Sequence, residues 1–214
     1  MTAPEAEAWA ERCAAHVREA MAVDAAHDIG HVRRVVTTAR RLAVAEGADL
    51  AVVLPAAWLH DVVTVPKDSP DRARASQMAA DAAAAWLAAE GFPANLVPAV
   101  AHAVAAHSFS AGIAPETPEA RVVQDADRLD ALGAVGLARM FATAGAMGAA
   151  LFHPDDPFAE SGRTPDDRAY SLDHVELKLL RLPHTMQTAA GRAEADHRAG
   201  VIRAFVADLR TEIG

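Results

Sequence analysis

The chain has 214 residues, of which 52% are hydrophobic and 23% are charged, so it can bury a substantial core and is not mainly disordered. Twenty Lys and Arg residues against 29 Asp and Glu residues give a formal net charge of -9. No global positive field therefore attracts nucleic acid, and an anionic substrate needs a local basic pocket.

Apolar residues recur at three- and four-residue spacing, and alanine dominates the apolar content, so the sequence predicts an all-α helical bundle. In chain order, the predicted helices span about 2–21, 28–46, 50–61, 73–90, 94–106, 117–132, 171–182 and 189–213. Thr2 and Glu5 form a capping box before the first helix, and Leu137 to Ala144 continue the sixth. Residues 62–74 are predicted to form an ordered loop. Glycine, proline and mixed charge predict a long surface excursion near 145–170.

Neither an extracellular nor a membrane location is indicated. Cys13 is the single cysteine and cannot form an intramolecular disulfide, and the first residues lack the pattern of a signal peptide. The longest stretch without Asp, Glu, Lys or Arg, 91–115, is interrupted by prolines, an asparagine and histidines. A membrane-spanning helix needs about 20 predominantly apolar residues. We expect a cytoplasmic protein with no membrane partner.

Four residues on three predicted helices carry the chemistry. His31 lies near the start of the second helix, His60 and Asp61 end the third, and Asp127 lies on the sixth. Two imidazoles and two carboxylates suit a divalent metal ion with positions left for water or substrate. Such an ion lowers the pKa of its water and offsets charge on phosphate oxygens. Taken singly, the His-Asp pair and the acidic helix also have ordinary structural explanations, so the combined order carries the argument.

That order resembles the HD-domain metal-dependent phosphohydrolases, in particular their bacterial YedJ-like subgroup. The similar segments are 26–35, 59–67, 106–111, 123–134, 171–174 and 186–188, so the resemblance covers almost the whole chain. It implies a single HD domain over 1–214, with a metal-site core at about 26–132 and C-terminal helices at about 171–213. No linker divides the chain.

The resemblance assigns the metal-binding and catalytic positions to His31, His60, Asp61 and Asp127. It implies one divalent ion, with Mn favoured and Mg, Fe, Co, Ni or Zn as alternatives. It also implies hydrolysis of a phosphorylated small molecule, foremost a nucleoside triphosphate split to monophosphate and pyrophosphate. A nucleotide phosphomonoesterase is the alternative within the same class.

This sequence departs from part of the family at one place. Some HD enzymes carry an acidic residue shortly after the paired ligands, where it helps to handle the attacking water. Val62, Val63 and Thr64 stand there instead. A guanosine tetraphosphate hydrolase is therefore disfavoured, and the proton-handling group remains unassigned.

Further polar residues are candidates for substrate binding. Lys67 and Arg72 lie in or near the loop beyond the paired ligands, where a cation can hold a phosphate tail; solvated loop charges are the alternative. The other candidates for substrate contact are His107, Arg128 and Asp130. The alternatives are a core histidine, an ion-pair partner within the solvated acidic helix and a structural hydrogen bond, respectively.

Three residues are expected to contact the metal ligands and not the metal itself. They are His27, Asp28, which also caps the second helix, and His102. If His102 or His107 bound a second iron, the chain would instead be a di-iron oxygenase. A non-catalytic binding module is the third hypothesis. Alanine-rich helix faces also permit a homodimer.

Overall fold

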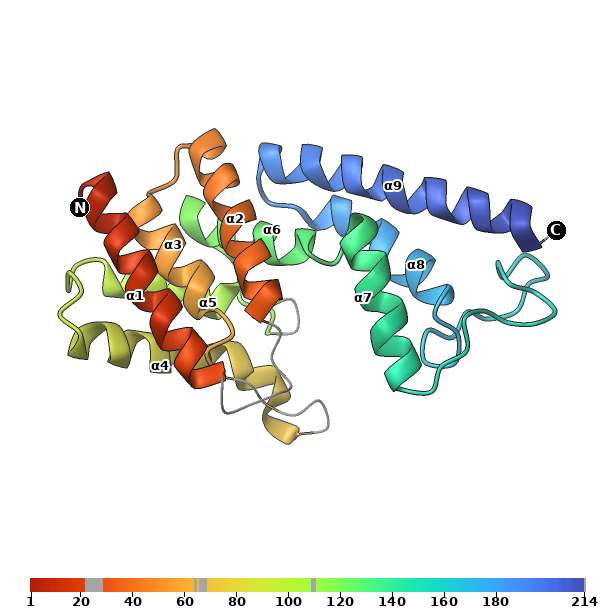
Figure 1. The fold of residues 1–214 in the computed structure, drawn as a ribbon, viewed down its shortest axis with the longest axis horizontal. Helices are drawn as coiled ribbons and strands as arrows, with labels where there is room; N and C mark the ends of the chain where they lie inside the picture. The colour runs from red at the N-terminus through yellow and green to blue at the C-terminus, as the bar shows by residue number, and fades with distance from the viewer. Residues whose placement is uncertain (22–28, 64, 66–68, 109–110, 214) are drawn as a thin grey trace. The chain divides into compact units, whose positions relative to one another are not determined.

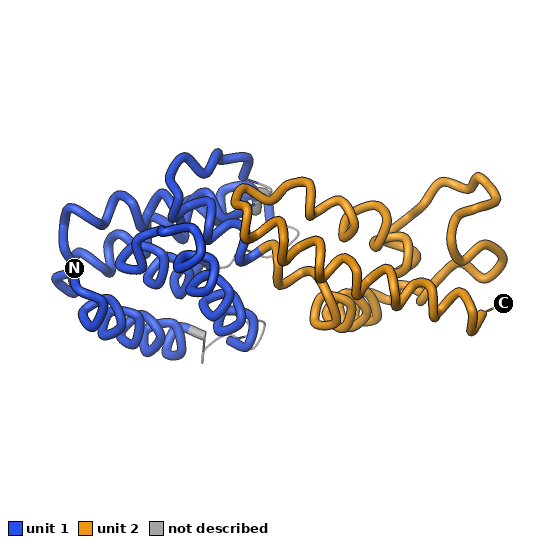
Figure 2. Tube along the Cα trace, turned by 90° about the horizontal axis from the view of Figure 1, so that it is seen from above, with its two compact units in different colours: residues 1–127 blue, residues 128–214 orange. Residues whose placement is uncertain are grey.

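The computed structural model describes residues 1–21, 29–63, 65, 69–108 and 111–213. Within these ranges every regular element is a helix, and the one β pairing is an isolated bridge between Ala150 and Tyr170. The predicted all-α class is therefore confirmed. The chain divides into two compact units, residues 1–127 and 128–214, which Figure 2 draws in blue and orange.

Unit 1 holds the helices that run from red to green in Figure 1. They are α1 (Ala3–Met21), α2 (Ile29–Glu46), α3 (Leu50–Leu59), the 3-10 helix η1 (Pro70–Arg74), α4 (Ala75–Ala89), α5 (Val97–Ala106) and all but the last two residues of α6 (Pro118–Leu129). The predicted capping box of α1 is confirmed. The amide of Thr2 donates to the Glu5 carboxylate at 2.7 Å, and the amide of Glu5 donates to Thr2 Oγ1 at 3.4 Å.

Helix α3 forms the centre of unit 1. It is apolar on every face, and all of its residues except Leu50 and Trp58 are buried. A helix of this kind must be surrounded by others, and α3 packs against α1, α2 and α5. Asp49 caps its N-terminus by accepting a hydrogen bond from the amide of Ala51 at 2.8 Å. Because His60 follows directly at the C-cap, it is placed inside the unit.

Unit 2 contains α7 (Gly133–Ala146), α8 (Asp173–Leu177), the 3-10 helix η2 (Leu179–Thr185) and α9 (Ala189–Ile213). Helix α9 packs against α7 and η2, and η2 packs against α8. Buried side chains on these elements include Leu137, Met140, Leu182, Ala195 and Ile202.

The predicted continuation of the sixth helix is wrong, because the chain turns between α6 and α7. The turn is closed by hydrogen bonds from the amide of Ala131 to the Arg128 carbonyl oxygen and from Leu132 to Leu129, both at 3.1 Å. Gly133 then takes a φ of +72°, a left-handed conformation that favours glycine. A Cβ on Gly136 would lie 2.2 Å from the carbonyl oxygen of Ala131, so the start of α7 approaches this turn at backbone distance.

The single helix predicted over 171–182 is also wrong. Helix α8 ends at Leu177, because Lys178 has φ −133° and ψ −58° and leaves the α-helical region. The chain continues in the tighter 3-10 form, with the amide of Arg181 bonded to the carbonyl of Lys178. Pro183 lies inside this 3-10 segment instead of ending it.

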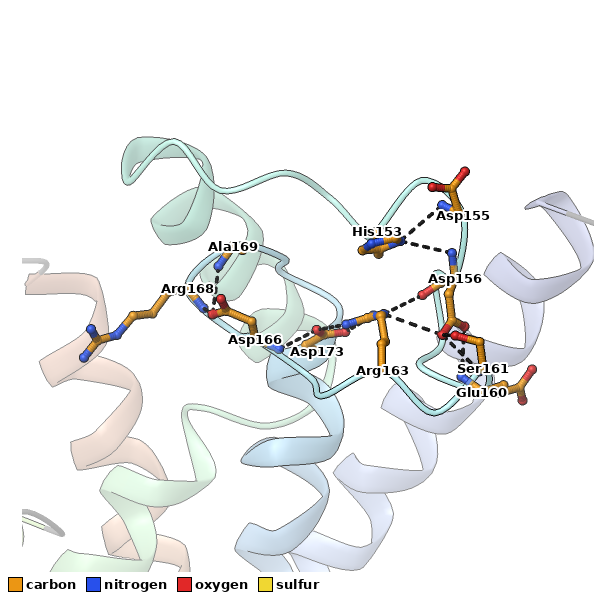
Figure 3. Close-up of polar contacts among 10 residues, drawn as sticks. All are labelled: His153, Asp155, Asp156, Glu160, Ser161, Arg163, Asp166, Arg168, Ala169 and Asp173. Atoms are coloured by element: carbon orange, nitrogen blue, oxygen red, sulfur yellow. Dashed lines mark hydrogen bonds and ion pairs between the residues drawn. The ribbon is translucent and has the colours of Figure 1, made fainter.

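The predicted surface excursion corresponds to residues 147–172, which contain no regular helix. A buried carboxylate organises the excursion, as Figure 3 shows. Both oxygens of Asp173 accept hydrogen bonds from Arg163 at 2.6 Å, and Oδ2 also accepts from the amide of Asp166 at 2.7 Å. Asp156 closes a second loop by accepting from the amide of Ser161 at 3.0 Å. Polar contacts thus shape this segment.

None of the helices in the described part of the chain is both long enough and apolar enough to span a membrane.

Candidate metal centre

The most buried member of the candidate site is His60. Its side chain is 0% exposed at the end of α3. Its Nδ1 lies 2.9 Å from the carbonyl oxygen of Ala57 and donates to it in the neutral form. This bond fixes the tautomer, so that the Nε2 lone pair is presented to the centre of the site, as in histidines that bind metals.

His31 reaches the same point from the first turn of α2. Its Nε2 atom lies 3.4 Å from His60 Nε2 and 3.3 Å from Asp127 Oδ1. Donor atoms of His31, His60 and Asp127 all lie within 4.8 Å of one another.

Asp61 lies beside this group and connects it to a third histidine. Asp61 Oδ2 is 3.4 Å from His60 Nε2 and 3.8 Å from His31 Nε2, whereas Oδ1 is 3.6 Å from His107 Nε2. Burial alone would raise the pKa of Asp61, but His60 and His107 outweigh this effect and hold the pKa well below its usual range. The carboxylate is therefore ionised at neutral pH.

Asp127 completes the set from the last turn of α6. Burial raises the pKa of its carboxyl, but the hydrogen bond from His31 and the nearby His60 outweigh this and lower it. For His60, burial lowers the pKa, and the charges of Asp61 and Asp127 outweigh it and raise it. Each group thus favours the ionic state of its neighbours.

The geometry of these donors fits a first-row metal ion. Two atoms bound to one ion at about 2.1 Å lie roughly 3.0–3.5 Å apart. The His31–Asp127, His31–His60 and His60–Asp61 contacts of 3.3, 3.4 and 3.4 Å match this spacing. Two further separations, His31–Asp61 and His60–Asp127, are 3.8 and 3.9 Å. Donor atoms of His31, His60 and Asp127 can therefore share one ion with small side-chain shifts, and the Asp61 carboxylate lies beside them.

The imidazoles and the carboxylates of the site differ in solvent exposure. His60, His107 and His31 are only 0, 8 and 12% exposed, whereas the side chains of Asp61 and Asp127 are 39 and 26% exposed. The imidazoles form the back of the site and the carboxylates face solvent.

The other sequence candidates are placed differently. His107 joins the site, because it lies beside Asp61 with its ring 5.0 Å from that of His60. His102 accepts a hydrogen bond from the amide of Glu116 at 3.0 Å. Arg128 donates to the carbonyl of Thr185 at 2.6 Å.

Asp130 is buried and pairs with Arg139, so the structure gives it a packing contact within unit 2. Four candidates lie outside the described part of the chain: His27, Asp28, Lys67 and the side chain of Arg72.

One buried polar residue on α6 was not among the candidates from the sequence. Gln124 is 2% exposed, and its Nε2 donates to the carbonyl oxygen of Ala106 at 2.6 Å. It ties α6 to the end of α5, directly before His107. Its place three residues before Asp127, on the same face of α6, was the available signal.

An all-α fold that gathers these histidines and aspartates from α2, α3 and α6 defines the class of HD-type metal-dependent hydrolases. Residues 27–132 match the HD domain family. The protein YpgQ of Bacillus subtilis is 34% identical over 191 residues, which are 87% of this chain and 84% of YpgQ. The chain therefore belongs to the HD-domain superfamily of metal-dependent phosphohydrolases.

Solved structures agree with this assignment over almost the whole length. The crystal structure of an HD-superfamily hydrolase from Bacillus thuringiensis has a TM-score of 0.76 and 32% identity, with 97% of both chains covered. The crystal structure of B. subtilis YpgQ in complex with ADP has a TM-score of 0.76 and 31% identity, and covers 97% of this chain and 96% of that one. The YedJ-like subgroup stays a prediction.

Proposed function

We propose that this enzyme hydrolyses nucleotides with one divalent metal ion, and that its preferred reaction splits a nucleoside triphosphate into a monophosphate and pyrophosphate. The observation that carries the proposal is the convergence of donor atoms of His31, His60 and Asp127 on one point, with the Asp61 carboxylate beside them. The ADP complex of YpgQ supports a nucleotide as the ligand class.

The proposed ligands are His31, His60, Asp61 and Asp127, with Mn as the favoured ion. When bound, the ion supplies a water of lowered pKa and offsets charge on phosphoryl oxygens. His60 holds its orientation through the Ala57 carbonyl. Asp61 directs Oδ2 toward the ligand nitrogens and leaves Oδ1 beside His107.

His107 is the proposed contact to the substrate. Its Nδ1 lies 2.6 Å from the carbonyl oxygen of Val104, which fixes the ring, and its Nε2 faces Asp61 Oδ1. A water that donates a hydrogen bond to Asp61 Oδ1 would lie within reach of this nitrogen. His107 therefore orients the reacting group next to the ion and does not take a ligand position.

The rest of the nucleotide needs positive charge, because the chain carries a net charge of -9. We assign this role to Lys67 and Arg72, which follow Asp61 along the chain. A cation there would hold the phosphate tail and stabilise charge that spreads over the phosphoryl oxygens. The proposal further places the enzyme in the cytoplasm, as one domain over 1–214 that is able to form a homodimer.

The test uses metal-stripped protein, added Mn and a panel of nucleoside mono-, di- and triphosphates, with phosphate and pyrophosphate measured separately. We expect pyrophosphate from triphosphates, lost in Asp61→Ala and retained in His197→Ala, which changes an exposed histidine on α9. Phosphate released from monophosphates instead supports the phosphomonoesterase. If Mn stays bound but neither phosphate nor pyrophosphate is released from any nucleotide of the panel, the result contradicts a nucleotide substrate.

A di-iron oxygenase is the alternative from another class, and the 3.6 Å contact of His107 with Asp61 is the observation in its favour. It requires a second ion bound by His107. One exchangeable ion per chain and oxygen-independent turnover support the hydrolase, whereas two iron atoms per chain and oxygen consumption support the oxygenase.

A further inference from the structure

The proposed metal ligand on α6 lies close to the C-terminal end of the helix. Asp127 lies in the last turn of α6, which ends at Leu129. The last carbonyl groups of a helix have no partner within the helix, so this turn frays unless other groups hold it. A metal ligand must keep its place to within about 0.5 Å to retain affinity. The contacts that hold the end of α6 therefore bear on the Asp127 carboxylate.

Arg198 on α9 makes one of these contacts, to a carbonyl oxygen that also accepts a hydrogen bond from the amide of Leu132 at 3.1 Å. Its Nη1 donates to the carbonyl oxygen of Leu129 at 2.7 Å, and its Nε donates to Glu194 Oε1 at 2.7 Å. Both bonds lie within residues 128–214. A guanidinium at this position satisfies a terminal carbonyl and interacts favourably with the negative end of the α6 dipole.

The stem of Arg198 is fixed as closely as its head. A Cβ on Gly133 would lie 3.3 Å from Arg198 Cγ and 3.4 Å from its Cβ, so the arginine stem lies along the glycine backbone. Only 21% of the Arg198 side chain is exposed. The side chain thus joins the end of α6, the start of α7 and Glu194 in one fixed arrangement.

We infer that Arg198 is a positioning residue for the metal centre. By holding the Leu129 carbonyl, it keeps the last turn of α6 helical and keeps the Asp127 carboxylate in place. Arg198 itself touches neither the ion nor the substrate. The inference rests on the proposed function, because it takes Asp127 as a ligand.

The test measures the Kd for Mn directly, by titrating metal-free protein and following free Mn by electron paramagnetic resonance. Loss of groups that orient a ligand typically costs 10–100-fold in metal affinity. We expect Arg198→Met to raise the Kd for Mn about tenfold. Arg198→Lys should give a smaller rise, because a single ammonium cannot reproduce the fork between Glu194 and Leu129. The matched control is Arg203→Met, an exposed arginine on the same helix.

The melting temperature of each metal-free variant separates positioning from general stability. A purely structural role lowers this temperature and leaves the Kd for Mn within twofold of wild type, which would overturn the inference. If Arg198→Met does not fold, Glu194→Gln is the second variant, because it leaves the guanidinium in place and weakens its orientation. An unchanged Kd in both Glu194→Gln and Arg198→Lys likewise overturns the inference. If wild-type protein binds no Mn, the proposed metal-dependent function is contradicted. This outcome is distinguishable from a result in which wild-type protein binds Mn and the Arg198 variants bind it equally well.

Discussion

His60 and His107 repeat one arrangement on either side of Asp61. Each occupies the C-cap of a helix, and each has its Nδ1 bonded to the carbonyl oxygen three residues earlier, at 2.9 and 2.6 Å. Their Nε2 atoms face different oxygens of Asp61, at 3.4 and 3.6 Å. One carboxylate is therefore shared by two imidazoles of fixed orientation.

Asp61→Asn keeps the shape of the side chain and removes its charge. We expect the Kd for Mn to rise at least tenfold, because the neutral amide is a weaker ligand and leaves the adjacent imidazoles without their anionic partner. Mn should then no longer raise the melting temperature as it does in wild-type protein. Thermal melting with and without Mn measures this, and an unchanged Mn-dependent shift would remove Asp61 from the ligand set.

His107→Gln tests whether this histidine serves the substrate. We expect a Kd for Mn within threefold of wild type and a kcat lowered roughly 100-fold, as for other lost groups that act on the reacting atoms. Steady-state kinetics and Mn titration on the same preparation measure both quantities. A Kd that rises as far as in His60→Gln would instead make His107 a metal ligand.

Acid should loosen the excursion through Asp173. Burial raises the pKa of this carboxyl, but the hydrogen bonds from Arg163 and the Asp166 amide outweigh it, so the folded pKa is lower than the unfolded pKa. The resulting stability is present above the unfolded pKa of about 3.9 and is lost as the pH falls through the folded value. Melting temperatures between pH 7 and pH 2 should therefore show a steeper acid loss in wild-type protein than in Asp173→Asn.

At pH 7, Asp173→Asn should itself cost about 1–3 kcal/mol, because a charged hydrogen-bonded pair is broken at a buried position. Limited proteolysis should then cut within 147–172 earlier than in wild-type protein. Equal cleavage rates would show that Asp173 does not organise the excursion.

Gly136→Ala should destabilise the protein by about 3 kcal/mol, because the new Cβ would meet the carbonyl oxygen of Ala131 at 2.2 Å. The matched control is Gly145→Ala, on the same helix with nothing within 4 Å of the added Cβ. This change should be neutral or stabilise by about 0.5–1 kcal/mol. Urea unfolding of both variants checks the difference, and equal free energies of unfolding would contradict the close backbone approach.

The sequence predicted those features that depend on local order. Helical spacing located α1 and α2, and the capping box of Thr2 and Glu5 is confirmed. The order of His31, His60, Asp61 and Asp127 sufficed to propose a metal centre, because chemistry-bearing residue types recur there at helix ends. The resemblance to HD proteins is confirmed by the comparisons.

What could not be predicted depends on contacts between distant segments. The end of α6 coincides with a close backbone approach of Gly136 to Ala131, which a helical pattern does not reveal. The contact of His107 with Asp61 joins residues from α5 and α3, and spacing along the chain gives no distance between them. The α-helix likewise ends before Lys178 through a change in backbone conformation, and no glycine or proline at this position signals it in the sequence.

The burial of α3 has a consequence for how the enzyme acquires its metal. Amide hydrogens in a helix that is surrounded on all sides exchange with solvent only when the whole unit opens. His60 is attached to the end of this helix, so its ring orientation should already exist in metal-free protein. Metal uptake then meets a preorganised imidazole, and the free energy of binding is not consumed in folding the site.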